Sequence, residues 1–402
     1  MKKRSLDEYI ISIVIKNIDL IVVGVLLLLS VYIRFYMMVH SSSNDYDIFI
    51  VPWIETYRKS IADAFREGVG DYYIPYNVFL AIASLIDVPA YISVGLFSCV
   101  FDYLTAFTIY KLLTDDFGRM ISKKIAASIS VAYLFIPTIV LNGAAWKQCD
   151  AIYAFFLVVL IKCLIEDKVK MAFIMLGISL SFKQQAIFIL PLIIILYFAN
   201  KNIKIIYSIY TLIVYLIAGL PAIAFGRSIK AVYAIYYYQM GRYREMTLNY
   251  PNFYMITMTD YEECHTYAII LTIAIFAIAF LLINSYYGAL NHQDIVTVAT
   301  WSIWTCCMFL PAMHQRYDYM VAILLVICLP LIRQDRRILA VISILLFYLG
   351  NTITYCYSLF GDDYNNIFVM CCNVLGYFVF TFLLWNILSH NAKITSSNIE
   401  KA

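Results

Sequence analysis

The chain has 402 residues, of which 63% are hydrophobic and only 14% are charged, and its formal net charge is +3. Soluble domains are usually about half apolar and about a quarter charged, so this balance excludes an ordinary soluble protein and predicts a polytopic membrane protein. The 29 Lys and Arg residues are scattered through short loops instead of forming a basic stripe, which argues against a nucleic-acid-binding surface.

Apolar segments of helical length recur along nearly the whole chain. A hydrocarbon core about 30 Å thick requires roughly 20 apolar residues in a helix. We therefore expect an all-α membrane protein in which residues 1–402 form a single bundle of about twelve transmembrane helices. The expected spans are 20–38, 92–112, 124–142, 151–165, 171–182, 186–199, 205–225, 266–284, 295–311, 319–332, 338–358 and 367–388.

Basic residues are unevenly distributed between the two sets of loops. One set holds 18 of the 29 Lys and Arg residues and consists of 1–19, 111–124, 162–170, 200–204, 285–294, 333–337 and 389–402. The positive-inside rule predicts that this set, with both termini, is cytoplasmic. The N-terminal segment lacks a short apolar core followed by a cleavage site, so we expect no cleaved signal peptide.

Two loops on the opposite side are large enough to contribute structure of their own. The first, 39–91, contains an amphipathic segment at 48–65 and an apolar segment at 76–87 that is too short to cross a bilayer, which predicts interfacial or re-entrant helices. The second, 226–267, is rich in tyrosine. These rings are a candidate platform for sugars, although aromatic residues also gather at any membrane interface.

Two carboxylates follow the first span, at Asp45 and Asp47. Transfer of a sugar from a lipid phosphate needs a base for the attacking hydroxyl, whereas the departing phosphate needs no strong acid. The alternative is that both residues solvate the loop and cap the following helix.

Further polar clusters interrupt apolar spans on the same predicted side. Lys147 and Lys183 are candidates for binding a phosphate, while Gln148 and Gln185 offer directed hydrogen bonds; snorkelling lysines and polar residues at helix ends are the alternative. His314 and Arg316 form a third cluster, in which the guanidinium could grip a phosphate, unless this is an ordinary polar loop. Asp102 lies within an apolar span and should face the bundle interior, paired or protonated.

The chain resembles the GT-C glycosyltransferases, especially bacterial relatives of the mannosyltransferase that adds the second mannose to GPI anchors. The resemblance covers most of the chain and rests on five short blocks in the same order. They are Asn44-Asp45-Tyr46 with Phe49 and Pro52-Trp53; Gly70-Asp71-Tyr72 with Pro75-Tyr76; Trp146-Lys147-Gln148-Cys149-Asp150; Ser181-Phe182-Lys183 with Gln185; and Met313-His314-Gln315-Arg316-Tyr317.

This resemblance implies an enzyme that transfers a mannose-like hexose from a polyprenyl-phosphate donor to a glycan or glycolipid acceptor at the extracytoplasmic face, with inversion. It implies that Asp45 is the general base, with Asp47 as second choice. It also implies a donor and acceptor pocket lined by Asp71, Lys147, Gln148, Asp150, Lys183, Gln185, His314 and Arg316. The chain departs from the family pattern at Lys147, where glycine is common, and at Gln315, where glutamate is common.

The expected setting is a bacterial plasma membrane, although the physics would be the same in the endoplasmic reticulum. No cofactor and no metal are indicated, because no phosphate loop, His-Glu-x-x-His or Cys-x-x-Cys motif is present. Two rival functions stay open: a transporter or flippase of lipid-linked sugars, which should show inverted repeats that we do not find, and a scaffold of a polysaccharide-assembly complex. A disulfide between Cys149 and Cys264 is also conceivable from their shared side.

Overall fold

The computed structural model describes residues 6–200, 202–239, 242–257, 260–361 and 367–399, and these residues are almost entirely helical. The α-helices in the first half of the chain are α1 (Leu6–Lys16), α2 (Ile18–His40), α3 (Val51–Lys59), α4 (Ile61–Glu67), α5 (Ile74–Leu85), α6 (Ala90–Lys111), α7 (Lys123–Tyr133), α8 (Pro137–Val140), α9 (Asp150–Ile165), α10 (Val169–Phe182) and α11 (Leu190–Ala199). Those in the second half are α12 (Ser208–Ala224), α13 (Ile229–Tyr233), α14 (Ile235–Gln239), α15 (Tyr254–Thr257), α16 (Tyr261–Leu282), α17 (His292–Phe309), α18 (Tyr319–Leu331), α19 (Arg337–Phe360) and α20 (Ile367–Ile399).

Short 3₁₀ and π-helical turns and one strand pair complete the fold. The turns are η1 (Tyr46–Ile50), η2 (Leu112–Asp116), η3 (Leu141–Ala145), η4 (Gln184–Ile189), η5 (Ile205–Tyr207), η6 (Ile283–Tyr287) and η7 (Gln334–Arg336). The strands β1 (Thr247–Leu248) and β2 (Met313–His314) pair in parallel, with Thr247 opposite Met313. This pairing joins the tyrosine-rich loop to the segment before α18.

Several helices are long and apolar enough to cross a membrane. Within the described residues there are six of them, or seven if the bent pair Lys123–Tyr133 and Pro137–Ala145 forms one crossing. Four further apolar helices are shorter: Ile74–Leu85, Val169–Phe182, Gln184–Ala199 and Tyr319–Leu331. The prediction of an all-α membrane protein is thus confirmed, whereas the expected number of about twelve crossings is not.

Helix starts and breaks follow local chemistry. The side chain of Asn291 accepts from the backbone N–H of Asp294, and the Asp294 side chain accepts in return from the Asn291 backbone, forming a capping box for α17. Between α7 and α8 the chain bends by 55°, just before Pro137, which cannot continue the preceding helix. At Lys183 the backbone is extended, so α10 ends before η4, between the expected spans 171–182 and 186–199.

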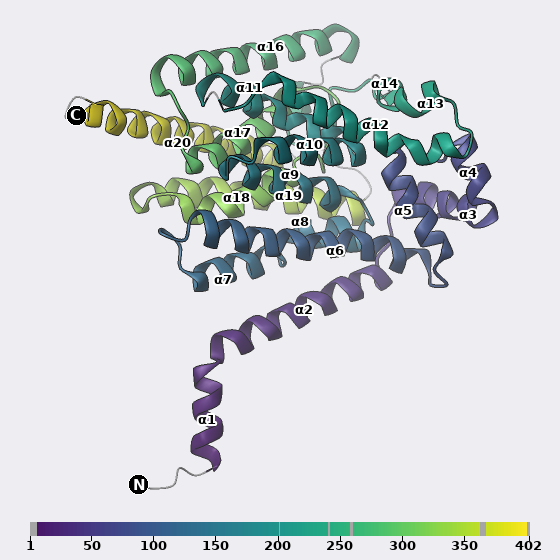
Figure 1. The fold of residues 1–402 in the computed structure, drawn as a ribbon, viewed down its shortest axis with the longest axis horizontal. Coiled ribbons are helices and arrows are strands. Elements are labelled where there is room, and N and C mark those ends of the chain that lie inside the picture. Colours follow the sequence, from purple (N-terminus) through teal and green to yellow (C-terminus); the bar gives the residue numbers. More distant parts are fainter. Residues whose placement is uncertain (1–5, 201, 240–241, 258–259, 362–366, 400–402) are drawn as a thin grey trace.

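The two large loops lie at the same end of the bundle. Figure 1 shows α3, α4 and α5 beside α13 and α14 at this end, while the C-terminus lies at the other. The interfacial segment expected at 48–65 is helical but breaks at Ser60, whose side chain caps α4 by accepting from the backbone of Asp63. The segment expected at 76–87 is α5, which packs against α3 and α6.

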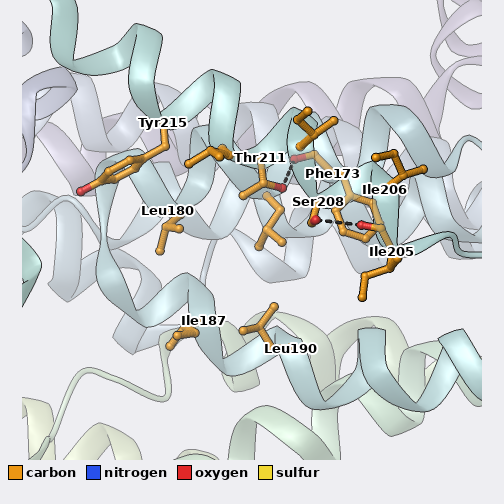
Figure 2. A pocket seen from close by; sticks show the side chains of 12 residues that line it. Phe173, Leu180, Ile187, Leu190, Ile205, Ile206, Ser208, Thr211 and Tyr215 are labelled. Carbon is orange, nitrogen blue, oxygen red and sulfur yellow. Dashed lines mark hydrogen bonds between the residues drawn. The ribbon is translucent and has the colours of Figure 1, made fainter. Parts of the chain in front are cut away.

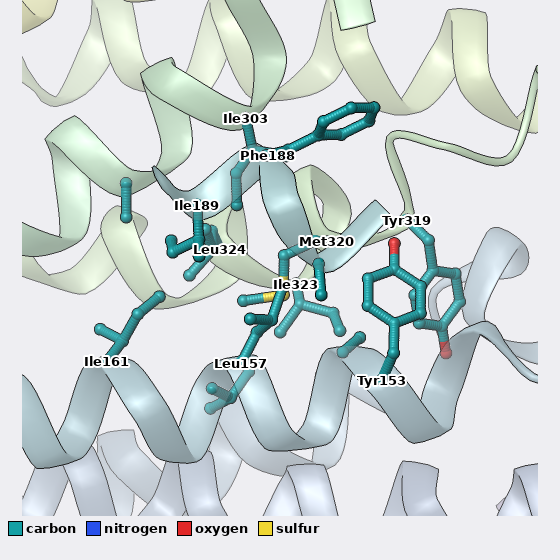
Figure 3. Packing of buried hydrophobic residues seen from close by; sticks show 14 of the residues in the cluster. Tyr153, Leu157, Ile161, Phe188, Ile189, Ile303, Tyr319, Met320, Ile323 and Leu324 are labelled. Carbon is teal, nitrogen blue, oxygen red and sulfur yellow. The ribbon is translucent and has the colours of Figure 1, made fainter. Parts of the chain in front are cut away.

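The interior of the bundle is apolar and tightly packed around α9, α17 and α18. Figure 3 shows Leu157 and Ile161 of α9 facing Met320 and Leu324 of α18, with Phe188 of η4 beside them. All five side chains are buried. Their packing holds the ends of α9, η4 and α18 in place, and polar residues adjoin each of those ends.

One buried ion pair ties α2 to the bundle. Arg34 Nε donates to Asp102 Oδ2 at 3.1 Å, and both side chains are buried. Tyr319 of α18 donates to the other oxygen of Asp102 at 2.9 Å. The expectation that Asp102 faces the interior and is paired is therefore confirmed. All ten cysteines are free, so the conceivable bridge between Cys149 and Cys264 is not formed.

Candidate active site

Three polar clusters that are far apart in the sequence come together at the end of the bundle that carries the large loops. The loop after α2 supplies Asp45, the segment between η3 and α9 supplies Gln148 and Asp150, and the break after α10 supplies Lys183. Arg316 comes from the short segment between β2 and α18. The helix breaks seen in the sequence thus place charged side chains at one location.

Asp45 is held in one orientation by three donors that converge on a single oxygen. Its Oδ2 accepts from Trp146 Nε1 at 3.1 Å, from Gln148 Nε2 at 3.0 Å and from Arg316 NH1 at 2.9 Å. Among the described residues no donor lies on Oδ1, and the side chain is 34% exposed. This geometry fixes the carboxylate through Oδ2 and leaves Oδ1 without a donor among the described residues.

Arg316 bridges Asp45 to a second carboxylate deeper in the bundle. Its Nε lies 3.9 Å from Asp150 Oδ2, and its guanidinium stacks over the Trp146 ring at 5.5 Å. Asp150 is fully buried and pairs with Lys183, while Asn142 donates to its Oδ2 at 3.0 Å. Buried charges are tolerated only when they are paired, so this ion-pair network is a specific structural feature of this end of the bundle.

A polar cleft of about 130 Å³ opens beside this network. Its charged and polar lining includes Asp71, Lys183, Gln185, His314 and Arg316. Two buried polar atoms here, Gln185 Oε1 and Arg316 Nε, have no hydrogen-bond partner in the described part of the chain. Unsatisfied buried polar atoms cost free energy, so their presence in a cleft is typical of a site for a polar ligand.

His314 is neutral at ordinary pH. Burial, followed by the nearby positive charges of Arg316 and Lys183, lowers its pKa from 6.5 to about 3. Its ring makes edge contacts with Tyr243 and Tyr317, at centroid distances of 4.9 and 5.1 Å. A neutral imidazole adds hydrogen-bonding capacity beside the cations without adding a further positive charge.

Asp71 lies at the rim of the cleft and forms an ion pair with Arg242, in which both side chains are partly exposed. The preceding Gly70 has φ +65° and is covered by the Trp53 ring, which would lie 2.7 Å from an added Cβ. A side chain at Gly70 would meet both strain and a clash, so glycine fixes the direction in which Asp71 leaves the loop.

Two of the candidate residues lie beside the network instead of in it. The Lys147 ammonium is buried and donates to the carbonyls of Ser41 and Ala145, with the latter at 3.0 Å. Burial lowers the pKa of Lys147 to about 8, against the opposing effect of Asp47. The Asp47 carboxylate accepts from Ser42 at 2.8 Å. In this arrangement both residues stabilise the loop that carries Asp45.

The backbone at Lys147 has φ +59°, in the left-handed region that favours glycine. The lysine therefore adopts a strained conformation in order to tether the end of α2 to the segment after η3.

The sequence reasoning missed several residues of this site as individual candidates. Trp146 stood in a recognised block but had no assigned role, although its indole donates to Asp45. Arg242 was missed altogether, and the signal would have been a cation next to the tyrosines of this loop. In the same loop, Tyr236 and Tyr243 line the cleft, which favours the sugar-platform interpretation for those two rings.

Comparison with known proteins does not assign the chain to a family. No protein-family model matches it, and no curated protein is significantly similar in sequence. Within the described residues, no three His, Cys, Asp or Glu side chains gather into a group able to hold a metal ion. What the site offers chemically is an oriented carboxylate with one open oxygen beside a cleft lined by three cations, Lys183, Arg242 and Arg316.

Proposed function

We propose that the protein is a membrane glycosyltransferase that moves a mannose-like hexose from a polyprenyl-phosphate donor to a hydroxyl of a glycan or glycolipid acceptor. The observation that carries this proposal is the juxtaposition of Asp45 with the cationic cleft. A base with one open oxygen stands beside a place for a phosphate, and the two are linked through Arg316. This pairing is what transfer from a sugar phosphate requires.

In the proposed reaction, Asp45 Oδ1 takes the proton of the acceptor hydroxyl while that oxygen attacks the anomeric carbon. The bond between this carbon and the phosphate oxygen breaks, and its electron pair leaves on the phosphate. Lys183 and Arg316 stabilise the phosphate as its negative charge grows. Attack opposite the departing group inverts the anomeric centre. Gln185 and His314 are placed to bind the hexose or the phosphate by hydrogen bonds.

An apolar groove next to the cleft supports a donor that carries a lipid. The groove has a volume of about 700 Å³ and lies between α10, η4, α11 and α12. Figure 2 shows Ile187 and Leu190 on one side of it and Leu180 and Thr211 on the other. Almost all of its lining is hydrocarbon, so it suits an isoprenoid chain.

Residues that line the groove contact a residue that lines the cleft. Tyr236, which lines the cleft, donates to the carbonyl of Leu180 at 2.6 Å, and Leu180 lines the groove. The Tyr236 ring also lies 6.0 Å from that of Tyr215, another groove residue. A single ligand with a phosphate at one end and an apolar tail would therefore contact both regions.

The site is proposed to face the extracytoplasmic side of a bacterial plasma membrane, as the distribution of basic residues predicts. The test is transfer of label from radiolabelled polyprenyl-phosphate hexoses to a crude glycolipid pool by the purified protein in liposomes. Labelled product supports an enzyme. Movement of the intact donor across the bilayer, without transfer from any hexose, would contradict it and favour the flippase.

A further inference from the structure

The helix α2 contacts the bundle mainly through the half that leads to Asp45. Its three buried residues, Ser30, Arg34 and Met38, all lie in that half. Met38 packs against Gly95 of α6, where an added Cβ would lie 2.6 Å from the Met38 sulfur. The N-terminal half diverges from the bundle, as Figure 1 shows, and most of its side chains are exposed.

This divergence leaves a wedge-shaped groove of about 860 Å³ between α2, α6 and α7. Its walls include Leu20, Leu26, Phe107 and Val131, and its lining is predominantly apolar. The hydrogen bond between Ser30 Oγ and the Tyr103 hydroxyl, at 2.9 Å, links α2 to α6 at Tyr103, which also lines the groove. A groove of this kind between membrane helices is filled by hydrocarbon and not by water.

Charge is concentrated at the end of the groove near the N-terminus of α2. Lys123 and Lys124, at the start of α7, line the groove there, together with Asp19 of α2. Lys124 pairs with Asp19. Lys123 has no ion-pair partner among the residues that the structure describes, so the mouth of the groove carries a net positive charge.

We propose that this groove, which we call the α2 wedge, binds an anionic phospholipid. Its phosphate lies on Lys123 and Lys124, and one acyl chain runs along the apolar walls between α2 and α6. Basic pockets between transmembrane helices are known to select anionic head groups. Within the described residues Lys123 lacks a carboxylate partner beside an apolar groove, and a phospholipid supplies both an anionic head group and an apolar chain. The proposal does not depend on the glycosyltransferase assignment.

The test is native mass spectrometry of the purified full-length protein titrated with dioleoyl-phosphatidylglycerol or dioleoyl-phosphatidylcholine. We expect one tightly bound lipid with roughly fivefold preference for the anionic one, because two lysines face it and one carboxylate opposes it. The double variant Lys123→Gln and Lys124→Gln should lose this preference. The matched control, Lys168→Gln with Lys170→Gln, makes the same charge change at exposed lysines outside the wedge and should keep it.

A second variant separates the tail from the head group. Ala127→Trp places a large ring in the groove while leaving both lysines in place, and it should reduce binding of both lipids. Equal affinity for the two lipids in the unmodified protein would overturn the proposal. So would an equal loss of preference in the Lys168 and Lys170 control, or a lipid-free dimer held together by α2. Size-exclusion chromatography verifies that each variant is folded.

Discussion

Replacing Asp150 by asparagine is expected to destabilise the protein by roughly 4 kcal/mol. The Asp150 carboxylate is fully buried, pairs with Lys183 and lies 3.9 Å from the Arg316 guanidinium. Asparagine keeps the shape but removes the negative charge, so both cations stay in the bundle end without their shared counter-ion. Loss of one partner from a buried ion pair typically costs about 3–5 kcal/mol, and Coulomb attraction across 4 Å at an effective dielectric constant of about 20 has the same size.

The effect of removing the other partner should be smaller. In Lys183→Met, Asp150 still has Asn142 as a donor and Arg316 nearby, so we expect a loss of about 2 kcal/mol. The double variant should recover about 2 kcal/mol of the summed single losses, because neither charge of the pair is left without its partner. The double variant should still be inactive, since Lys183, one of the two cations proposed to stabilise the phosphate, is gone.

The assay is thermal and denaturant unfolding of purified protein in detergent, followed by a double-mutant cycle. The matched control is Asp71→Asn, which makes the same substitution in a partly exposed ion pair and should cost less than about 1 kcal/mol. An Asp150→Asn loss below about 1 kcal/mol would refute the reasoning, as would strictly additive effects in the cycle.

Three other outcomes can be checked. Burial lowers the pKa of His314 to about 3, so between pH 6.5 and pH 3 the unfolded chain binds a proton that the folded protein does not. The free energy of unfolding should therefore fall by about 2 kcal/mol from pH 7 to pH 5. Thermal melts of His314→Gln at the two pH values should lack this contribution. Lys147→Gly should be about 1 kcal/mol more stable than Lys147→Ala. Both variants lose the hydrogen bonds of the Lys147 ammonium, but only alanine is strained by the left-handed backbone at φ +59°. Equal melting temperatures of the two variants would contradict this. Arg316→Lys should lower kcat/KM for transfer by about tenfold to a hundredfold because an ammonium cannot reproduce the planar fork that reaches Asp45, and unchanged kinetics would remove Arg316 from the mechanism.

The positions of several apolar helices could be predicted from hydropathy alone, whereas the expected span at 124–142 is broken by a bend of 55°. The expected span at 171–182 is α10, Val169–Phe182, and the one at 319–332 is α18, Tyr319–Leu331. The polar interruption at Lys183 was also visible in the sequence, between the expected spans 171–182 and 186–199. The number of crossings was not settled by the same reasoning, since short apolar helices inside a bundle look like spans in the sequence.

The partners within the site could not be predicted in the same way. The three donors on Asp45 are 101, 103 and 271 residues away along the chain, and Arg242 is 171 residues from Asp71. Such pairings depend on how the helices pack, and local sequence patterns carry no information about that packing. For Arg34 the sequence does contain a signal, because a cation within an apolar span requires a buried anionic partner. In the structure that partner is Asp102.

The most direct test of the proposed mechanism is transfer activity in Asp45→Asn beside Asp47→Asn, measured with the same labelled polyprenyl-phosphate hexose in liposomes. Both substitutions remove one carboxylate from the same loop, but only Asp45 is held by Trp146, Gln148 and Arg316. We predict that Asp45→Asn loses transfer by at least about a hundredfold while remaining folded, and that Asp47→Asn retains most of it. An active Asp45→Asn protein would contradict the assignment of Asp45 as the base.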